Sequence, residues 1–360
     1  MYRVSHGPWE ALRLLPGYYR PTCGITPSSH LSSRASYHDI GKAQPVTTVH
    51  GSLDVDSFRS LAWEPAIPVH LEDSHHLPAV TNWFTSRNSE TKGPLTFSDK
   101  LWSFATMEMP YELIVSGHRP ESPSTSSSSS SCLRDFRTWL PSQTAEHDGP
   151  LLRQLVDQLL QSVEERQSRF LQFGAPLSLI IEASRYNRDT NGRSCPIQQL
   201  YIAQCDIRGL PEPLGEDLPV PEIVSRAGKG DVYSSSIWLG LQPTYTPLHR
   251  DPNPNLFCQL VGSKVVRLFR PKTGLSVFQD VRRRLGLAGD ARLRGPEMMD
   301  GPERDGLHHA TWVNPDPSKE IWEAVLSSGD ALFIPQGWWH SVRSVGHEGE
   351  LNASANWWFR

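Results

Sequence analysis

The sequence predicts a mainly β protein with flanking helices, folded as a jelly roll, also called a double-stranded β-helix. Short apolar runs in the C-terminal half alternate with turn residues, which is typical of antiparallel sheets. The polar residues of greatest chemical interest lie far apart in the chain. They can meet only if strands that are distant in sequence become neighbours, as they do in this class of fold.

The composition is that of a soluble globular protein. The chain of 360 residues is long enough for one large domain or two modest ones, with 38% hydrophobic and 21% charged residues. No apolar run is long enough to span a bilayer, so we expect no membrane partner. A net charge of -4 disfavours nucleic acid as a partner. The five cysteines form no C-x-x-C pair, and their scattered positions indicate reduced thiols in an intracellular compartment.

Residues 1–45 are interpreted as a tail. Up to His38 this segment is rich in arginine and serine and contains one acidic residue, Glu10. Such a composition is typical of a mitochondrial transit peptide, although Pro8 and Pro16 leave little room for the amphipathic helix that one needs. A transit peptide and a disordered tail both stay open, and mitochondrion, cytoplasm and nucleus stay open with them.

Residues 46–360 are expected to form one domain. Within it, residues 46–198 supply strands and short helices that pack on the rest. The serine-rich stretch 120–132 cannot bury apolar area and is expected to be a disordered loop. Leucine and valine recur at helical spacing over 151–163, which predicts a packing helix. Residues 177–183 are predicted to form a strand.

The barrel core is expected over residues 199–360. Its predicted strands are short apolar runs between turn residues, namely 199–204, 236–241, 256–261, 265–269 and 331–334. Gly262 and Ser263 separate two such runs and predict a two-residue hairpin turn. Gly329 and Asp330 predict the turn before the strand that delivers His340. The charged stretch 273–317 is expected to be a partly helical insertion near the barrel mouth.

His249, Asp251 and His340 form a candidate metal site. His249 and Asp251 are two positions apart, so both side chains point to the same side of an extended strand. His340 would come from a strand folded back beside the first. Two imidazoles and one carboxylate hold non-haem Fe(II) on one face and leave positions open for O2 and a co-substrate. The alternative is an ordinary hydrogen-bonded histidine at 249, because a His-x-Asp pair alone is a weak signal.

Lys264 is a candidate anion-binding residue. In the predicted hairpin it pairs with Val261, and Asn255 lies on the same face by the period of two. A lysine inside an apolar strand costs stability unless it has an anionic partner. A dicarboxylate such as 2-oxoglutarate is a partner of that kind. The alternative is an exposed lysine in a turn.

Residues 238–271, which contain TPLHRDPNPN, resemble the core of the JmjC-domain, cupin-like oxygenases. They are most similar to the small protein-hydroxylase branch, which includes factor-inhibiting HIF and the JmjC arginyl hydroxylases. SGDALFIPQGWWH at 328–340 and NWWF at 356–359 are similar as well, and YIAQ at 201–204 resembles the tyrosine-bearing strand before this core. The resemblance is weak over 46–198.

The resemblance implies an Fe(II)- and 2-oxoglutarate-dependent dioxygenase that consumes O2 and releases succinate and CO2. It implies His249, Asp251 and His340 as the catalytic metal ligands, Thr246, Lys264 and Tyr201 around the distal carboxylate of 2-oxoglutarate, and Asn255 and Asn356 along the co-substrate pocket. Trp357 and Trp358 are interpreted either as aromatic residues beside the site or as barrel core.

The favoured activity is hydroxylation of an aliphatic carbon in a protein or peptide side chain. The alternatives are an N-methyl-lysine (histone) demethylase of the same chemistry, an RNA-modifying oxygenase, and a catalytically silent cupin that only binds a ligand. The resemblance also leaves a homodimer open.

Overall fold

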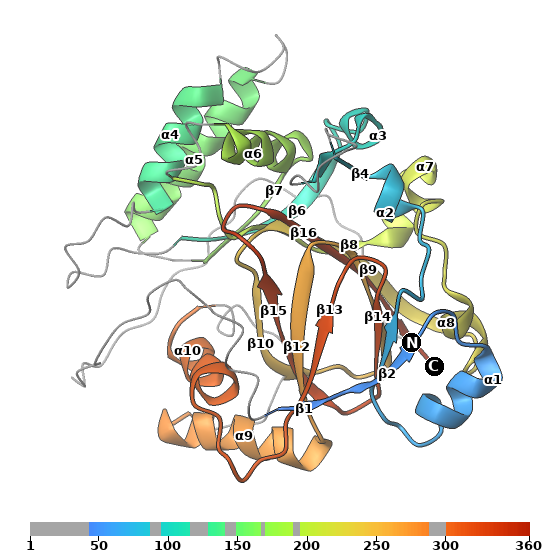
Figure 1. The fold of residues 1–360 in the computed structure, drawn as a ribbon. Helices are drawn as coiled ribbons and strands as arrows, with labels where there is room; N and C mark the ends of the chain where they lie inside the picture. The colour runs from blue at the N-terminus through green and yellow to red at the C-terminus, as the bar shows by residue number, and fades with distance from the viewer. Residues whose placement is uncertain are drawn as a thin grey trace, which may run out of the picture. The chain divides into compact units, whose positions relative to one another are not determined.

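The computed structural model describes seven stretches of the chain, namely residues 43–86, 95–115, 129–140, 149–166, 170–189, 195–287 and 300–360. Two β-sheets dominate them (Figure 1). The five-stranded sheet has the order β1 (Gln44–Pro45), β13 (Trp322–Leu326), β12 (Ser263–Phe269), β15 (Trp339–Val345) and β10 (Tyr245–Arg250). The nine-stranded sheet has the order β2 (Thr47–His50), β3 (Val69–Glu72), β14 (Ala331–Ile334), β11 (Asn255–Val261), β16 (Leu351–Phe359), β9 (Val232–Leu241), β8 (Leu200–Asp206), β6 (Glu108–Ile114) and β7 (Phe170–Pro176).

The two sheets face each other, which confirms the predicted jelly roll. Val266 and Leu268 of the five-stranded sheet are buried in one apolar cluster with Phe257 and Leu332 of the nine-stranded sheet. All strand pairs in these sheets are antiparallel except β1–β13 and β2–β3. A short third sheet joins β4 (Phe84–Thr85) to β5 (Thr96–Phe97).

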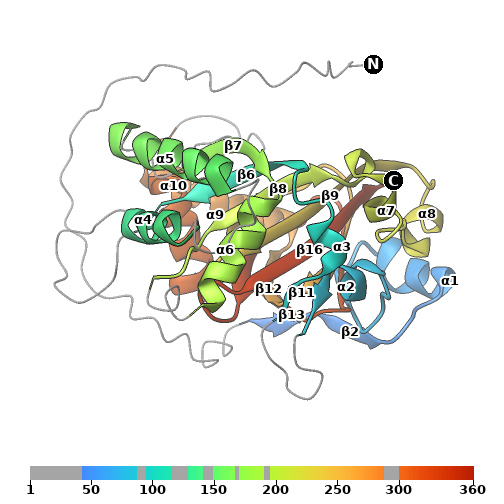
Figure 2. The same cartoon turned by 90° about the horizontal axis from the view of Figure 1, so that it is seen from above.

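Helices cover the outer faces of both sheets (Figure 2). On the nine-stranded sheet they are α1 (Val55–Phe58) with the π-helical turn Arg59–Trp63, α2 (Ala79–Asn82), α3 (Asp99–Trp102), α4 (Ser129–Trp139), α5 (Gly149–Arg166), α6 (Ser178–Arg188), α7 (Glu212–Gly215) and α8 (Glu222–Arg226), with a 3-10 turn at Ile207–Gly209. On the five-stranded sheet they are α9 (Pro271–Arg284) and α10 (Pro302–His308), which continues as the π-helical turn His309–Val313. Among the described helices, none is both long and apolar enough to cross a membrane.

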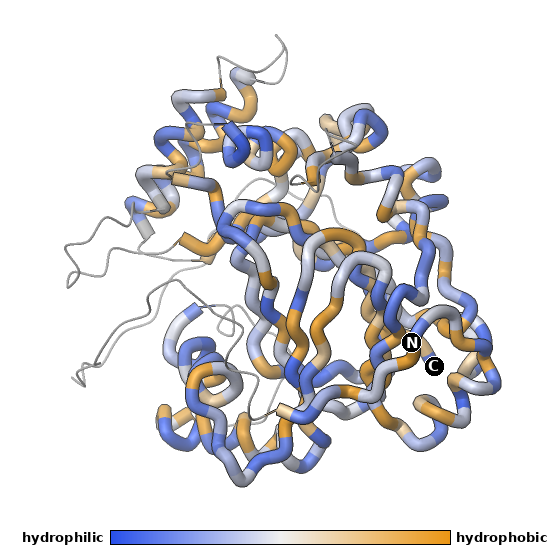
Figure 3. The backbone as a smooth tube through the Cα atoms, viewed as in Figure 1, coloured by the Kyte–Doolittle hydropathy of each residue, from blue (hydrophilic) through white to orange (hydrophobic). Residues whose placement is uncertain are grey.

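Strand alternation separates the outer core from the space between the sheets. Along β16, Ala355 and Trp357 are buried with the helices, whereas Ser354, Asn356 and Trp358 face inward. The tube in Figure 3 shows the same mixture of hydrophobic and hydrophilic positions along the central strands. The two faces of one strand therefore serve stability and site construction separately.

Most predicted elements of the core are confirmed. The helix predicted at 151–163 lies within α5, and the strands predicted at 199–204 and 331–334 correspond to β8 and β14. The runs at 236–241, 256–261 and 265–269 lie in β9, β11 and β12. Three strands from before residue 115, namely β2, β3 and β6, also join the nine-stranded sheet, so the sheets use more of the chain than the predicted core.

Three predictions in the N-terminal half need correction. Residues 1–42 of the predicted tail lie outside the described residues, but Gln44–Pro45 pair with β13, so the fold begins before residue 46. The serine-rich loop predicted at 120–132 extends too far, because α4 already begins at Ser129. Residues 120–128 of that prediction lie outside the described residues. The strand predicted at 177–183 is wrong, because Ser178–Arg188 form α6. That segment is buried on nearly every side, so its apolar run carried no usable periodicity.

The hairpin predicted at Gly262 and Ser263 is also wrong. β11 pairs with β14 and β16, whereas β12 pairs with β13 and β15, so the chain crosses between the facing sheets at this turn. Gly262 has a φ of +70° there, and an added Cβ would lie 2.8 Å from the carbonyl oxygen of Leu351. Asn255 and Lys264 therefore approach the same space from opposite walls and not from adjacent strands.

The described part of the predicted insertion is largely helical, and its position near the mouth stays a prediction. Val277, Phe278 and Val281 of α9 pack with Trp339 of β15 on the outer face of the five-stranded sheet. Gly274 permits this contact, because an added Cβ would lie 2.2 Å from the Trp339 ring. No described residue of 273–317 lines the cavity between the sheets.

The prediction of reduced thiols is wrong for two of the five cysteines. A disulfide joins Cys132 of α4 to Cys195, across a sequence separation of 63 residues. Cys205 and Cys258 are free. Nothing in the spacing marked Cys132 and Cys195 as partners, because α4 and the chain before β8 meet only in the folded structure.

Candidate active site

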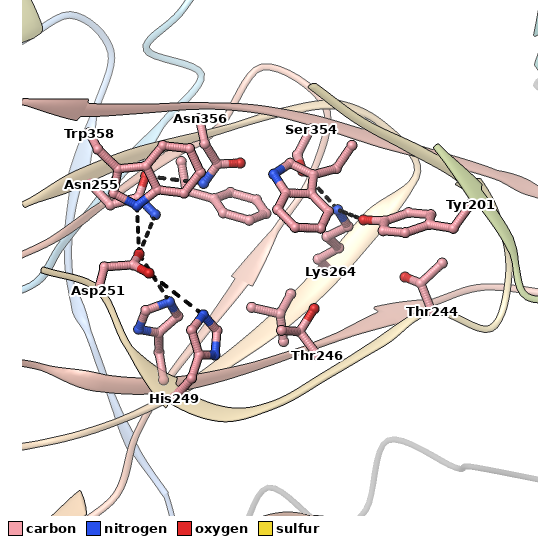
Figure 4. A pocket seen from close by; sticks show the side chains of 14 residues that line it. Tyr201, Thr244, Thr246, His249, Asp251, Asn255, Lys264, Ser354, Asn356 and Trp358 are labelled. Carbon is pink, nitrogen blue, oxygen red and sulfur yellow. Dashed lines mark hydrogen bonds and ion pairs between the residues drawn. The ribbon is translucent and has the colours of Figure 1, made fainter. Parts of the chain in front are cut away.

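A cavity between the two sheets contains all eight residues predicted for the site (Figure 4). Those are Tyr201, Thr246, His249, Asp251, Asn255, Lys264, His340 and Asn356. The remaining lining residues are Trp238, Thr244, Phe257, Val342, Ser354 and Trp358. Donors for a metal lie at one end of the cavity, and Lys264 lies at the other.

The His–Asp–His group is assembled by two paired strands. His249 of β10 is directly opposite His340 of β15, and their ring centroids are 4.2 Å apart. Asp251 follows β10, with Oδ1 3.8 Å from His249 Nε2 and Oδ2 3.5 Å from His340 Nε2. One candidate donor atom from each residue falls within 4.8 Å of the others. A single divalent ion can therefore be reached by all three.

Backbone carbonyls orient both imidazoles. His249 Nδ1 lies 2.8 Å from the carbonyl oxygen of Pro247, and His340 Nδ1 lies 3.4 Å from that of Trp338. A carbonyl oxygen only accepts hydrogen bonds, so Nδ1 is the protonated nitrogen in each ring. Each Nε2 then faces the Asp251 carboxylate, and in the neutral ring its lone pair would be available to a metal ion.

Asp251 is held by donors on the nine-stranded sheet. Its Oδ2 accepts hydrogen bonds from Asn255 Nδ2 at 3.0 Å and from the Trp358 indole N–H at 2.8 Å. Asn356 Nδ2 in turn donates to Asn255 Oδ1 at 3.0 Å. The amides of Asn255 and Asn356 thus support the carboxylate, where the sequence predicted only that they line the pocket.

Lys264 is buried in an apolar wall with few partners. Its side chain is 2% exposed, and its ammonium donates to Ser354 Oγ at 2.8 Å and lies 3.5 Å from the Tyr201 hydroxyl. Among the described residues no carboxylate forms an ion pair with it. Burial lowers the pKa of Lys264 to about 7. A dicarboxylate placed in the cavity would supply the missing negative charge.

Tyr201 reaches Lys264 because of a glycine on the neighbouring strand. Tyr201 of β8 is paired with Gly240 of β9, and an added Cβ at 240 would lie 1.9 Å from Tyr201 Cδ2. Figure 4 places Thr244 and Thr246 across the cavity from Tyr201 and Ser354. Hydroxyl groups therefore surround the ammonium end of the cavity from two walls.

Gly240→Ala is expected to weaken 2-oxoglutarate binding several-fold and to destabilise the fold by about 1–3 kcal/mol, because the Tyr201 ring must move. Calorimetric titration and thermal unfolding would measure the two effects. Gly215→Ala is the matched control, because an added Cβ there meets nothing within 4 Å. Unchanged affinity in Gly240→Ala would show that Tyr201 does not contribute to the co-substrate site.

One lining residue missed in the sequence, Ser354, could have been found by alternation. Ser354 and Trp358 are each two positions from Asn356 on β16, so the period of two places all three on one face, and Trp358 lies beside the site, as one of its two interpretations proposed. Trp238, Phe257 and Val342 had no such signal, because apolar residues in strands are usually core. Trp357 is 1% exposed and belongs to the outer core, as one of its two interpretations proposed.

Residues 154–360 match the cupin-like domain family, which covers more than half of the chain, and the chain belongs to that family. Together with its relatives and its His–Asp–His group, this makes it a cupin protein of the JmjC type. The hydroxylase branch suggested by the sequence stays a prediction.

The chain is similar to curated relatives over half of its length or less. It is 28% identical to "Lysine-specific demethylase JMJ30" of Arabidopsis thaliana over 172 residues, which are 48% of this chain and 36% of that protein. It is 30% identical to "Lysine-specific demethylase 8" of Danio rerio over 161 residues, 44% of this chain and 36% of that one. "JmjC domain-containing protein D" of Dictyostelium discoideum is 30% identical over 155 residues, 40% and 32% respectively. The chain thus spans about a third of the length of these relatives.

Proposed function

We propose that the protein is an Fe(II)- and 2-oxoglutarate-dependent dioxygenase that hydroxylates an aliphatic carbon of a protein side chain. One observation carries the proposal: a three-donor metal set and a buried lysine without a carboxylate partner among the described residues share one cavity. The first fits a ferrous ion and the second fits the distal carboxylate of 2-oxoglutarate. Membership of the JmjC-type cupins supports the same chemistry.

Each residue has a distinct role in this proposal. His249, Asp251 and His340 would hold Fe(II), which supplies the sites for 2-oxoglutarate and O2 and the oxidative decarboxylation that yields succinate and CO2. Lys264 would bind the distal carboxylate, and its ammonium would stay charged because the ligand offsets its desolvation. Thr246 and Tyr201 would donate hydroxyl hydrogen bonds to the same carboxylate. Phe257 and Val342 would exclude water from the walls between the two ends.

The second candidate is N-methyl-lysine demethylation, which is favoured by the names of two relatives. The chemistry is the same up to the hydroxylated carbon. Hydroxylation of a carbon bonded to carbon leaves the oxygen in the product. Hydroxylation of an N-methyl group gives a carbinolamine, whose C–N bond breaks to release formaldehyde and the amine. The kind of carbon that the bound substrate presents to the metal, and not the metal site itself, would decide between the two reactions.

Incubation of the protein with Fe(II), 2-oxoglutarate, O2 and a peptide library is expected to give peptides that gain one oxygen atom, without formaldehyde. Mass spectrometry and a formaldehyde assay read the two products in the same sample. His340→Ala is the control, because it removes a metal ligand. Loss of a methyl group from methyl-lysine peptides together with formaldehyde would overturn hydroxylation in favour of the second candidate. Binding of 2-oxoglutarate without turnover of any peptide would point to a silent binding module.

A further inference from the structure

We propose that Trp358, together with Asn255, is a positioning residue that makes Asp251 a one-oxygen metal ligand. Both donors hold Oδ2 of the carboxylate, which would leave Oδ1 as the oxygen that a bound ion meets. The inference rests on the metal site proposed above and adds which side chains orient one of its three ligands.

The contacts converge on one oxygen atom. The Trp358 indole N–H donates to Asp251 Oδ2 at 2.8 Å, and the Asn255 amide donates to the same atom at 3.0 Å. Two accepted hydrogen bonds occupy the lone-pair directions in which Oδ2 would bind a metal, so Oδ1 becomes the better ligand. Both donors are uncharged, which leaves the full negative charge of the carboxylate available to the ion.

The direction of this hydrogen-bond chain is dictated by the carboxylate. An ionised Asp251 can only accept, so Asn255 must turn its NH2 group toward it. Asn255 Oδ1 then faces Asn356, which must present its own NH2 group, as the 3.0 Å contact shows. Asn356 Oδ1 has no partner among the described residues and faces the cavity (Figure 4). A misdirected amide at either position would turn an oxygen toward an acceptor, so the chain has one orientation.

The sheet holds these groups in register. Asn255 of β11 is paired with Trp358 of β16, so the two donors leave adjacent positions on neighbouring strands. Asp251 itself lies beyond the end of β10, where the backbone is not fixed by strand pairing. The carboxylate therefore depends on its side-chain partners for its orientation more than the two histidines do, because strand pairing fixes His249 and His340.

The test is metal binding by the purified full chain, with Co(II) as a spectroscopic probe in place of Fe(II). Trp358→Phe keeps the aromatic ring but removes the N–H. It is expected to weaken Co(II) binding by about 10-fold, within the range typical of lost outer-shell partners, and to change the visible Co(II) spectrum as Asp251 becomes free to bind through both oxygens. Trp357→Phe is the matched control, because that neighbouring ring is buried in the outer core and should alter neither affinity nor spectrum.

Wild-type affinity and an unchanged spectrum in Trp358→Phe would overturn the inference. If that variant does not fold, Asn255→Ala tests the same claim from the other donor: a similar loss supports it, and an unchanged spectrum overturns it. Two other results would contradict the proposed function and not only this inference. If the wild-type protein binds no Co(II), or binds it equally after His249→Ala, the metal site itself is wrong.

Discussion

His340→Ala is expected to lower the affinity for Fe(II) by more than about 100-fold and to abolish consumption of 2-oxoglutarate. Loss of an outer-shell partner alone typically costs 10–100-fold, and this change removes one of three direct donors. The remaining pair, His249 and Asp251, could not hold the ion on one face of the cavity. Succinate formation and the metal content of the purified protein would measure both effects.

His309→Ala is the control for this variant. His309 is exposed in the π-helical turn after α10 and lies outside the cavity, so its loss should leave metal content unchanged. Retention of iron and of 2-oxoglutarate consumption by His340→Ala would show that the His–Asp–His group is not the metal centre.

Lys264→Met is expected to abolish tight 2-oxoglutarate binding while making the ligand-free protein more stable. Methionine is close to lysine in length and flexibility, so the cavity wall is preserved. The pKa of Lys264 is lowered from 10.5 to about 7, and each unit corresponds to about 1.4 kcal/mol of penalty for the charged form. Removing a buried charge without a carboxylate partner therefore stabilises the fold, whereas the dicarboxylate loses its cation.

The stability gained by Lys264→Met is expected to depend on pH. Below pH 7 both the folded and the unfolded protein carry a protonated Lys264, so the full free-energy penalty of burying the charged ammonium lowers the stability of the wild-type fold. Between pH 7 and 10.5 the unfolded chain binds the extra proton, so stability rises with pH and the penalty disappears near 10.5. The gain in melting temperature of Lys264→Met should thus be largest at or below pH 7 and vanish near pH 10.5.

Binding should show the opposite trend in the wild-type protein. Because the dicarboxylate needs the protonated ammonium, its affinity should fall as the pH rises above about 7, the pKa of Lys264 in the free protein. Calorimetric titrations across this range would measure it. Equal 2-oxoglutarate affinity in the wild type and Lys264→Met would mean that another residue binds the distal carboxylate.

The fold was predictable where local pattern and tertiary environment agree. Strand β14 and helix α5 have lengths and apolar spacings that permit one interpretation each. Residues 177–183 were misassigned because a helix buried on all sides shows the same continuous apolar run as a buried strand. The Cys132–Cys195 disulfide joins segments whose proximity no local pattern encodes.

The sequence singled out those cavity residues that differ chemically from their surroundings. A histidine, an aspartate or a lysine within apolar strands attracts attention because its burial needs a reason. Lys264 and Asn255 do share a cavity, but by a crossing between sheets and not by the predicted hairpin. For Trp357 and Trp358 the sequence left two interpretations open, because a tryptophan in a strand is most often core. The structure separates them, since Trp358 donates to Asp251 at 2.8 Å whereas Trp357 is buried in the outer core.

Anaerobic titration of the purified protein with Fe(II) and 2-oxoglutarate tests the central claim most directly. If His249, Asp251 and His340 hold the metal beside a Lys264-bound co-substrate, a visible metal-to-ligand charge-transfer band should appear and saturate at one equivalent of each. Asp251→Ala should remove the band, and Lys264→Met should shift its half-saturation to much higher 2-oxoglutarate concentration. A folded wild-type protein that gives no such band would contradict the account.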